Sequence, residues 1–109
     1  MTPEKTEGPR IALLALPEST PAAIYGLYEV FLSAGRTWEQ LTGEPSDVPV
    51  MTPRIVSASG APVETAYGLS IGPHEAMGAA DIEIVTDLVL DDRPLAGRWT
   101  REVAWLRGV

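Results

Sequence analysis

Residues 10–35, RIALLALPESTPAAIYGLYEVFLSAG, decide the fold. Residues 11–16 are apolar at every position, whereas a strand with one face in water would alternate apolar and polar side chains. This stretch therefore predicts a strand that is covered on both faces, as in the middle of a parallel sheet. Thr20 and Pro21 then predict the N-cap and the first residue of a helix, and Gly35 is placed to end it.

The predicted helix has one apolar face that can lie on a sheet. Apolar side chains recur on it at helical spacing, at Ile24, Leu27, Tyr28, Phe31 and Leu32. Gly26 lies inside the same helix, where glycine costs up to about 1 kcal/mol of helix propensity. Close packing of another backbone against the helix would explain a glycine at this position.

Further elements follow in an order typical of α/β proteins. Residues 54–59 predict a second strand, parallel to the first, and residues 81–86 predict a third. Residues 36–53 predict an irregular connection with room for one more helical turn, and residues 95–106 predict an amphipathic helix. Its apolar stripe comprises Leu95, Trp99, Val103 and Leu106, and we expect Trp99 and Trp105 to belong to the core or to an uncovered apolar patch.

Between the second and third strands the pattern predicts an excursion from the main sheet. Residues 63–66 and 69–71 predict a short hairpin, and residues 73–77 predict at most a helical turn. The fold class that follows is three-layer α/β, with a flavodoxin-like, mostly parallel sheet and flanking helices, incomplete at its C-terminal side. We assign residues 10–109 to this domain and residues 1–9 to a flexible tail.

Composition restricts the classes of function. The chain has 109 residues, eight of them basic, no cysteine and a net charge of −7. Nucleic acids and anionic membranes attract basic surfaces, so we expect direct contact with neither. The lack of cysteine excludes disulfides, thiolate metal sites and a thiol nucleophile. Since no signal peptide or bilayer-spanning segment is predicted, we expect a cytoplasmic protein.

Four segments resemble a known family in order and spacing. They are RIALLALPESTPAAIYGLYEVFLSAG (10–35), RIVSASGAPVETAYGLSIGPH (54–74), DIEIVTD (81–87) and LAGRWTREVAWLR (95–107). Together they are similar to the ThiJ/PfpI-like, class I glutamine amidotransferase-like domain at the N-terminus of AraC-type transcriptional regulators. The resemblance implies an effector-sensing or dimerisation segment, with a small-molecule effector for the complete domain and either a homo-oligomer or a complementing chain.

The sequence also departs from that family. The family's nucleophile-elbow cysteine and its two helix-turn-helix units follow the elements found here, so we expect a chain truncated before the elbow, without catalysis or DNA binding of its own. In the family's enzymes an acidic residue near the start of the first helix accompanies the cysteine, and here Ala23 takes that position, with Glu18 out of register. Because strands that follow are missing, we expect an uncovered sheet edge and marginal stability or oligomers.

Two alternatives remain open. One is a fragment or split chain of a ThiJ/PfpI-class enzyme that takes its nucleophile from a partner segment. The other is a freestanding interaction module that completes its sheet with another chain.

A serine hydrolase is a weaker reading of one motif. Residues 68–72 match G-x-S-x-G around Ser70, but Pro73 follows at once and the sole histidine, His74, comes four residues after the serine with no acid between. We interpret the motif as a turn and a short strand, and His74 as a loop or cap residue. No catalytic residue is therefore assigned.

Strand ends supply the candidate ligand site. Open α/β sheets bind ligands beyond the carboxyl ends of their strands, and the free N–H groups at a helix start attract anions. Glu18, Ser19 and Thr20 follow the first strand and Asp87 follows the third, so we expect these four residues to line an effector site. The alternative is that Thr20 only caps the helix.

The acidic stretch after residue 80 predicts no metal site. It comprises Asp81, Glu83, Asp87, Asp91 and Asp92 and lacks the spacing of a calcium-binding loop. Solvated strand ends and turns explain it, and we expect neither a metal nor a cofactor.

Overall fold

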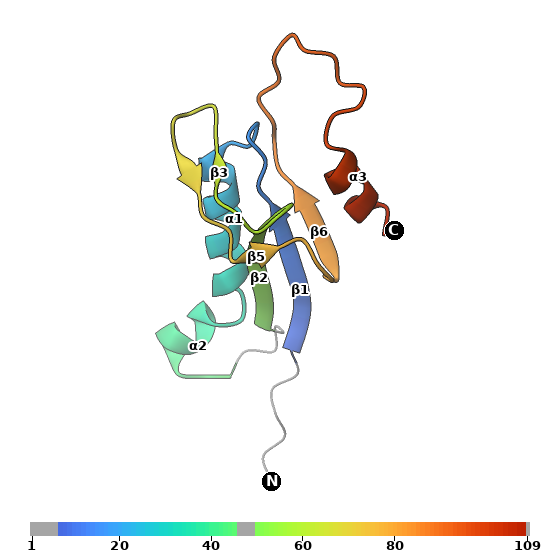
Figure 1. Cartoon of the computed structure of the whole chain (residues 1–109). Coiled ribbons are helices and arrows are strands. Elements are labelled where there is room, and N and C mark those ends of the chain that lie inside the picture. Colours follow the sequence, from blue (N-terminus) through green and yellow to red (C-terminus); the bar gives the residue numbers. More distant parts are fainter. Residues whose placement is uncertain (1–6, 46–49, 109) are drawn as a thin grey trace.

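The computed structural model describes residues 7–45 and 50–108 (Figure 1). Most of the tail predicted for residues 1–9 lies outside these ranges. The elements are β1 (Glu7–Leu14), α1 (Pro21–Ser33), α2 (Thr37–Thr42), β2 (Val50–Ser57), β3 (Val63–Glu64), β4 (Ser70–Ile71), β5 (Glu75–Ala76), β6 (Ile82–Val85) and α3 (Thr100–Leu106).

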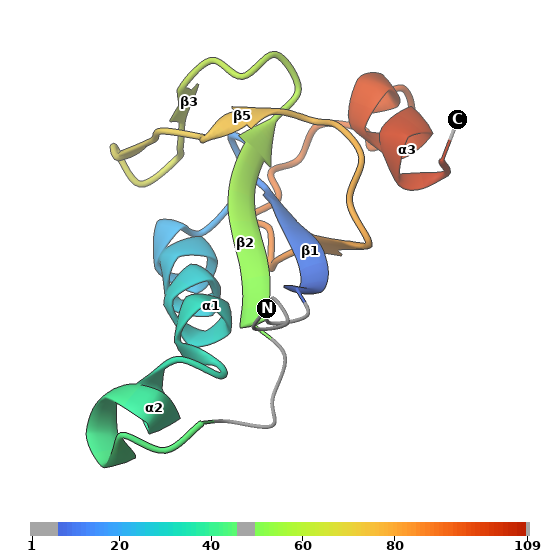
Figure 2. The same ribbon diagram turned by 90° about the horizontal axis from the view of Figure 1, so that it is seen from below.

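Four of the strands form an all-parallel sheet in the order β5-β2-β1-β6, and β3 and β4 form a separate antiparallel hairpin. In the main sheet Leu13 of β1 lies between Ile55 of β2 and Ile84 of β6. α1 and α3 lie on opposite sides of this sheet (Figure 2). The three longer strands thus follow the order second, first, third, with which the flavodoxin-like order begins. The predicted α/β class, with helices flanking a parallel sheet, is confirmed.

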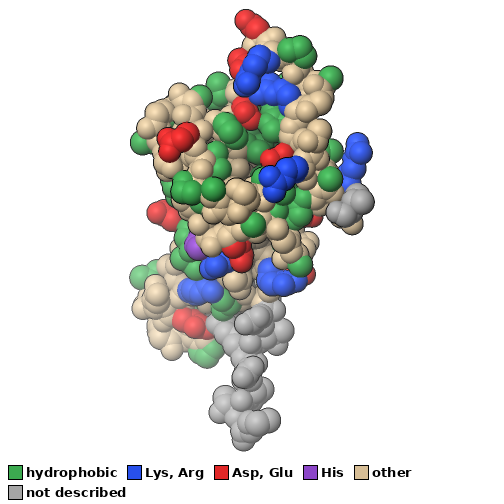
Figure 3. Space-filling model, in the orientation of Figure 1, with side chains coloured by type: hydrophobic (Ala, Val, Ile, Leu, Met, Phe, Trp, Pro, Cys, Tyr) green, Lys and Arg blue, Asp and Glu red, His purple; other side chains and the backbone are tan. Residues whose placement is uncertain are grey.

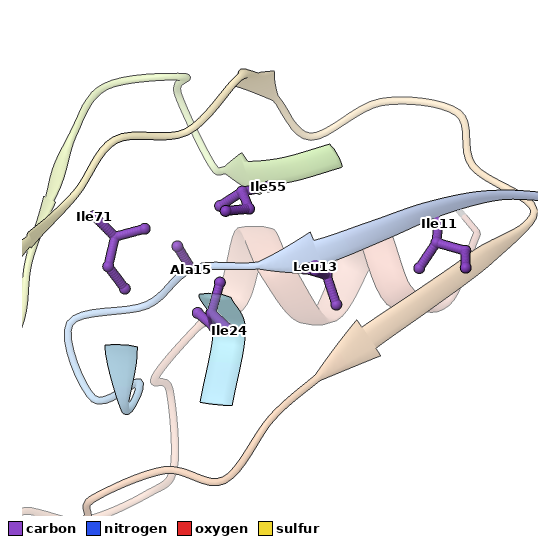
Figure 4. Packing of buried hydrophobic residues seen from close by; sticks show 6 residues of the cluster. All are labelled: Ile11, Leu13, Ala15, Ile24, Ile55 and Ile71. Atoms are coloured by element: carbon purple, nitrogen blue, oxygen red, sulfur yellow. The ribbon is translucent and has the colours of Figure 1, made fainter. Parts of the chain in front are cut away.

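The continuous apolar run in β1 is explained by cover on both sides. On the side of α1 the buried core is formed by Ile11, Leu13, Ala15, Ile24, Ile55 and Ile71 (Figure 4). On the opposite side it is formed by Ala12, Leu14, Leu16 and Val56, with Trp99 and Trp105 packed against them. Burying one aliphatic side chain of this size contributes about 1.5–3 kcal/mol, so β1 is the centre of the hydrophobic stabilisation.

β1 starts earlier than predicted, and one side chain of α1 that was expected to face the sheet is exposed. β1 already begins at Glu7, so residues 7–9 belong to a strand and not to a tail. α1 begins at Pro21 as predicted, and Gly35 follows it with a φ of 78°. Leu32, expected on the apolar face toward the sheet, is 38% exposed.

β2 begins four residues earlier than predicted and contains Pro53. Alternate residues of a strand in a parallel sheet bond to opposite neighbours. The carbonyl of Val56 accepts from the amide of Ala15 in the loop after β1, whereas Ile55 bonds to His74 on the other side. The nitrogen of Pro53 therefore points away from β1, toward an edge that β5 does not reach, and no ladder hydrogen bond is lost.

Two segments adopt a different structure from the one predicted. Residues 73–77 contain the strand β5, which pairs with Val56 and Ser57, and not a helical turn. α3 begins at Thr100, five residues later than expected, because Gly97 has a φ of 78° and Trp99 a φ of 56°. Neither conformation continues a right-handed helix.

Candidate functional site

A tight turn carries the chain from β1 into α1. The amide of Leu16 donates to the hydroxyl oxygen of Ser19 (2.9 Å), and the amide of Ser19 donates to the carbonyl of Leu16 (2.9 Å). Ser19 is fully buried. Its side chain therefore fixes the turn at the carboxyl end of β1, so that it orders the neighbouring candidates rather than facing a ligand.

The ends of β1 and β6 meet as the strand-end rule predicts. The hydroxyl of Thr20 donates to Asp87 Oδ1 at 2.6 Å, and the amide of Val89 donates to the carbonyl of Glu18 at 2.8 Å. Thr20 occupies the N-cap of α1 in an extended conformation, but its side chain forms no capping hydrogen bond. The interpretation of Thr20 as only a cap is therefore wrong, because its hydroxyl joins the loop after β1 to the loop after β6.

Glu18 is the buried acid of this edge, with 8% of its surface exposed. The indole N–H of Trp99 donates to Glu18 Oε1 at 2.7 Å, and Arg98 Nη2 lies 3.5 Å from Glu18 Oε2. A buried carboxylate is strongly destabilising unless it is paired and hydrogen-bonded. Both requirements are met by two consecutive residues that precede α3.

Arg98 connects the buried Glu18 to an exposed acid, Asp91. Its side chain is 14% exposed, its guanidinium carbon lies 4.5 Å from the centre of the Trp99 ring, and its Nη1 lies 3.5 Å from Asp91 Oδ1. Such a stack on an aromatic face is favourable for a cation. Nη1 is buried and forms no hydrogen bond with the described residues, so the pairing with Asp91 is electrostatic only.

Asp91 is held in its charged form. The backbone amide of Arg93 donates to it and, as the largest effect, lowers its pKa below the ordinary 3.8. Desolvation, the second-largest effect, raises the pKa, and the guanidinium groups of Arg93 and Arg98 each lower it by less. The cluster of Glu18, Asp91, Arg98 and Trp99, here called the Glu18 cluster, therefore combines two acids, a cation and an aromatic ring.

Two hollows adjoin the Glu18 cluster. One, of about 390 Å³, is lined by Leu16, Pro17, Glu18, Arg93, Arg98, Trp99, Thr100, Arg101 and Glu102. The other, of about 330 Å³, is lined by Pro17, Glu18, Glu64, Thr65, Ala66, Val89, Leu90, Asp91 and Arg93. Small-molecule sites begin at about 300 Å³. Side chains of both charge signs, with apolar ones between them, gather over the long loop between β6 and α3 (Figure 3).

His74 and Ser70 lie outside this arrangement. The amide of Ile55 donates to His74 Nδ1 (2.9 Å), the amide of His74 donates to the carbonyl of Ile55 (2.7 Å), and the imidazole ring lies 5.3 Å from that of Tyr28. His74 thus continues the pairing of β2 toward β5. Ser70 is exposed on the hairpin strand β4, and not on a strand-to-helix turn, which the hydrolase motif requires.

The acidic stretch is divided among separate partners. Asp81 accepts from the amide of Arg10, which is the largest of the effects that lower its pKa, whereas Asp87 bonds to Thr20 and Asp91 to Arg93. Over residues 7–45 and 50–108, no group of three or more His, Cys, Asp or Glu side chains is placed to hold a metal ion.

No family model, curated protein or solved structure matches this chain. Among the described helices, none is long and apolar enough to cross a bilayer. The function is therefore inferred from the site itself and from the segments quoted above.

Proposed function

We propose that this chain is the effector-sensing segment of an AraC-type transcriptional regulator and that a small polar molecule binds at the carboxyl edge of its sheet. One observation carries the proposal: a buried carboxylate, Glu18, is held by Arg98 and Trp99 between two hollows of small-molecule size. Carboxylate, guanidinium and indole groups that converge on a hollow are the usual means of orienting a small polar ligand.

Binding without catalysis fits the groups at this edge. The hydroxyl of Ser19 is bonded within its turn, and that of Thr20 donates to a carboxylate. The sole histidine, His74, is bonded to Ile55, so neither hydroxyl has an imidazole base beside it. With a net charge of −7, the segment is also unsuited to DNA, and DNA contact falls to another part of the regulator.

Trp99 connects the site at Glu18 to the helix α3. Trp99 directly precedes α3 and holds a left-handed conformation that bulky residues rarely adopt. A ligand that donates to Glu18 in place of the indole N–H would free Trp99 and shift the start of α3. Binding at the edge would thus change the position of a helix.

The test is a ligand screen on the purified chain, read by indole fluorescence and by thermal unfolding. The panel comprises free amino acids, small amines and small dicarboxylates at millimolar concentration. A binding compound should raise the unfolding temperature of the wild type but not of Glu18→Gln. Glu29→Gln, an exposed charge-matched control on α1, should respond like the wild type. Equal responses of the wild type and Glu18→Gln to every compound that binds would contradict the proposal.

The alternative of an interaction module is favoured by a different observation. The outward surface of α1 exposes several large apolar side chains, which the binding of a small molecule at Glu18 does not explain.

A further inference from the structure

A hollow of about 360 Å³ lies between the sheet and the loop that leads from β5 to β6. Residues 77–81 of this loop contain no helix and pass over β1 (Figure 1), and Met77 and Ala80 pack on the core cluster on the side of α3. Connections between parallel strands are usually helices that cover the sheet, and here the loop leaves a hollow in place of such a cover. The hollow shares no lining residue with the two hollows beside Glu18, so it is a separate place on the molecule.

Two arginines line this hollow, on a face where parallel sheets normally carry apolar side chains. Arg10 is the register partner of Thr52, and Arg54 is that of Ala12. Because side chains alternate between the two faces of a sheet, Arg10 and Arg54 lie on the face of Ala12. Ordinary strand spacing puts their Cα atoms about 8 Å apart. Two like charges this close repel each other unless a negative group lies near both.

Each arginine has an acidic neighbour, but neither guanidinium group is saturated. Arg54 Nε donates to Glu75 Oε1 at 3.2 Å, and Arg10 Nε lies 3.5 Å from Asp81 Oδ2. The side chains of both pairs are about half exposed, and ion pairs with that exposure are weak. A guanidinium group has five N–H donors, and the terminal nitrogens of both arginines form no hydrogen bond with any residue in 7–45 or 50–108. Both arginines therefore have donors for a further anion.

We infer that this hollow binds a small organic molecule with one carboxylate. The carboxylate lies between Arg10 and Arg54, because a guanidinium group binds a planar carboxylate through two parallel N–H···O bonds. The apolar part of the molecule lies against the methyl groups of Ala76 and Ala79, which are exposed in the wall of the hollow. A mostly apolar lining with a few converging polar groups is typical of small-molecule sites, which begin at about 300 Å³. The inference does not depend on ligand binding at Glu18.

Charge favours a ligand with a single negative charge. Glu75 and Asp81 balance the two arginines, so the four side chains together have no net charge. One carboxylate can lie between the guanidinium groups, whereas the second charge of a dicarboxylate or a phosphate would meet the two acids. A neutral molecule offers only weaker hydrogen bonds to the donors, and an amine is repelled by the arginines.

Isothermal titration calorimetry of the full chain at low salt tests the site. Benzoate and hexanoate are the probes, because each joins one carboxylate to an apolar ring or chain, and we expect at least one of them to bind the wild type at a single site. Arg54→Gln should weaken this binding about tenfold or more, because a charged pair of hydrogen bonds is lost. Arg107→Gln makes the same charge change directly after α3, outside the hollow, and should bind like the wild type.

Arg10→Gln should also weaken the binding about tenfold. It keeps the test valid if Arg54→Gln fails to fold, since the backbone amide that donates to Asp81 remains. Glu18→Gln should leave the binding unchanged, which separates this site from that of the proposed function. Benzyl alcohol, which lacks the charge, and phthalate, which has a second one, should each bind at least tenfold more weakly than benzoate.

Four results would overturn the inference. The first is that neither probe binds the wild type at millimolar concentration, and the second is that the folded arginine variants bind as the wild type does. The third is that benzyl alcohol or phthalate binds as tightly as benzoate. The fourth is that Glu18→Gln abolishes the binding, which would place the probe at the carboxyl edge of the sheet.

Discussion

The contribution of the hydrogen bond from Trp99 to Glu18 to stability can be measured with Trp105 as the control. The indole N–H of Trp99 donates to the buried carboxylate, whereas that of Trp105 donates to the neutral carbonyl of Gly78 at 2.8 Å. Both rings are half-buried against the same core cluster. Substituting each by Phe removes one N–H donor and a similar amount of apolar surface. Phe at position 99 still offers an aromatic face to the Arg98 guanidinium, so the two variants differ mainly in the charge of the lost acceptor.

We expect Trp99→Phe to lower the free energy of unfolding by about 1.5–3 kcal/mol, the usual contribution of a hydrogen bond to a charged group. Trp105→Phe should lower it by about 0.5–1.5 kcal/mol, as for a neutral acceptor. At roughly 4–8 °C per kcal/mol for a domain near 100 residues, the difference is measurable. Urea unfolding followed by far-ultraviolet circular dichroism is the assay, because indole fluorescence changes with the substitutions themselves.

A double-mutant cycle then assigns the loss to the pair. In a Glu18→Ala background the indole N–H of Trp99 no longer has its carboxylate acceptor, so Trp99→Phe should cost only its lost packing. The reasoning is refuted if Trp99→Phe costs no more than Trp105→Phe. It is equally refuted if the cost of Trp99→Phe is the same with and without Glu18.

Two further predictions concern the hairpin and acid stability. Ile71 is fully buried in the core beside α1, so Ile71→Ala should lower the free energy of unfolding by about 2–5 kcal/mol. A loss below about 1 kcal/mol in urea unfolding would show that the β3–β4 hairpin does not contribute to that core. The pKa values of Asp81 and Asp91 are lowered in the folded chain from an ordinary 3.8, so their contribution is present above pH 3.8 and is lost as the pH falls through the lowered values. The urea midpoint of Asp81→Asn/Asp91→Asn should therefore fall less steeply than that of the wild type below pH 4, and parallel curves would contradict this.

Local signals in the sequence predicted the centre of the fold. The apolar run before Pro17, the proline at the start of α1 and Gly35 at its end each depend on neighbouring residues only. The structure confirms both ends of α1 and a strand in the apolar run, although the strand ends at Leu14 and not at Leu16. β5 depends on pairing with the distant β2, which no local pattern records. The late start of α3 depends on the left-handed Trp99, a conformation that the tertiary contacts of a bulky residue impose and its propensity does not.

The candidate site was predicted in part. The rule for strand ends brought Thr20 and Asp87 together, and the structure joins them by a hydrogen bond. Arg98 and Trp99 were missed as partners of Glu18 because 81 residues separate Glu18 from Trp99. One signal was present, since an acid next to a buried strand end needs a cation or donor. The sequence offers several of both, however, and only the folded chain selects among them.

Pro53 affects which edge of the sheet can pair with an additional strand. Pro53 has no N–H, and the amide of Ile55 already donates to His74, so an incoming polypeptide finds neither of these two donors on the outer margin of β2. We therefore expect strand addition, by another peptide or by a further copy of this chain, at the opposite edge of the sheet, along β6. The two edges of the sheet therefore differ, and an added strand would extend the sheet from β6.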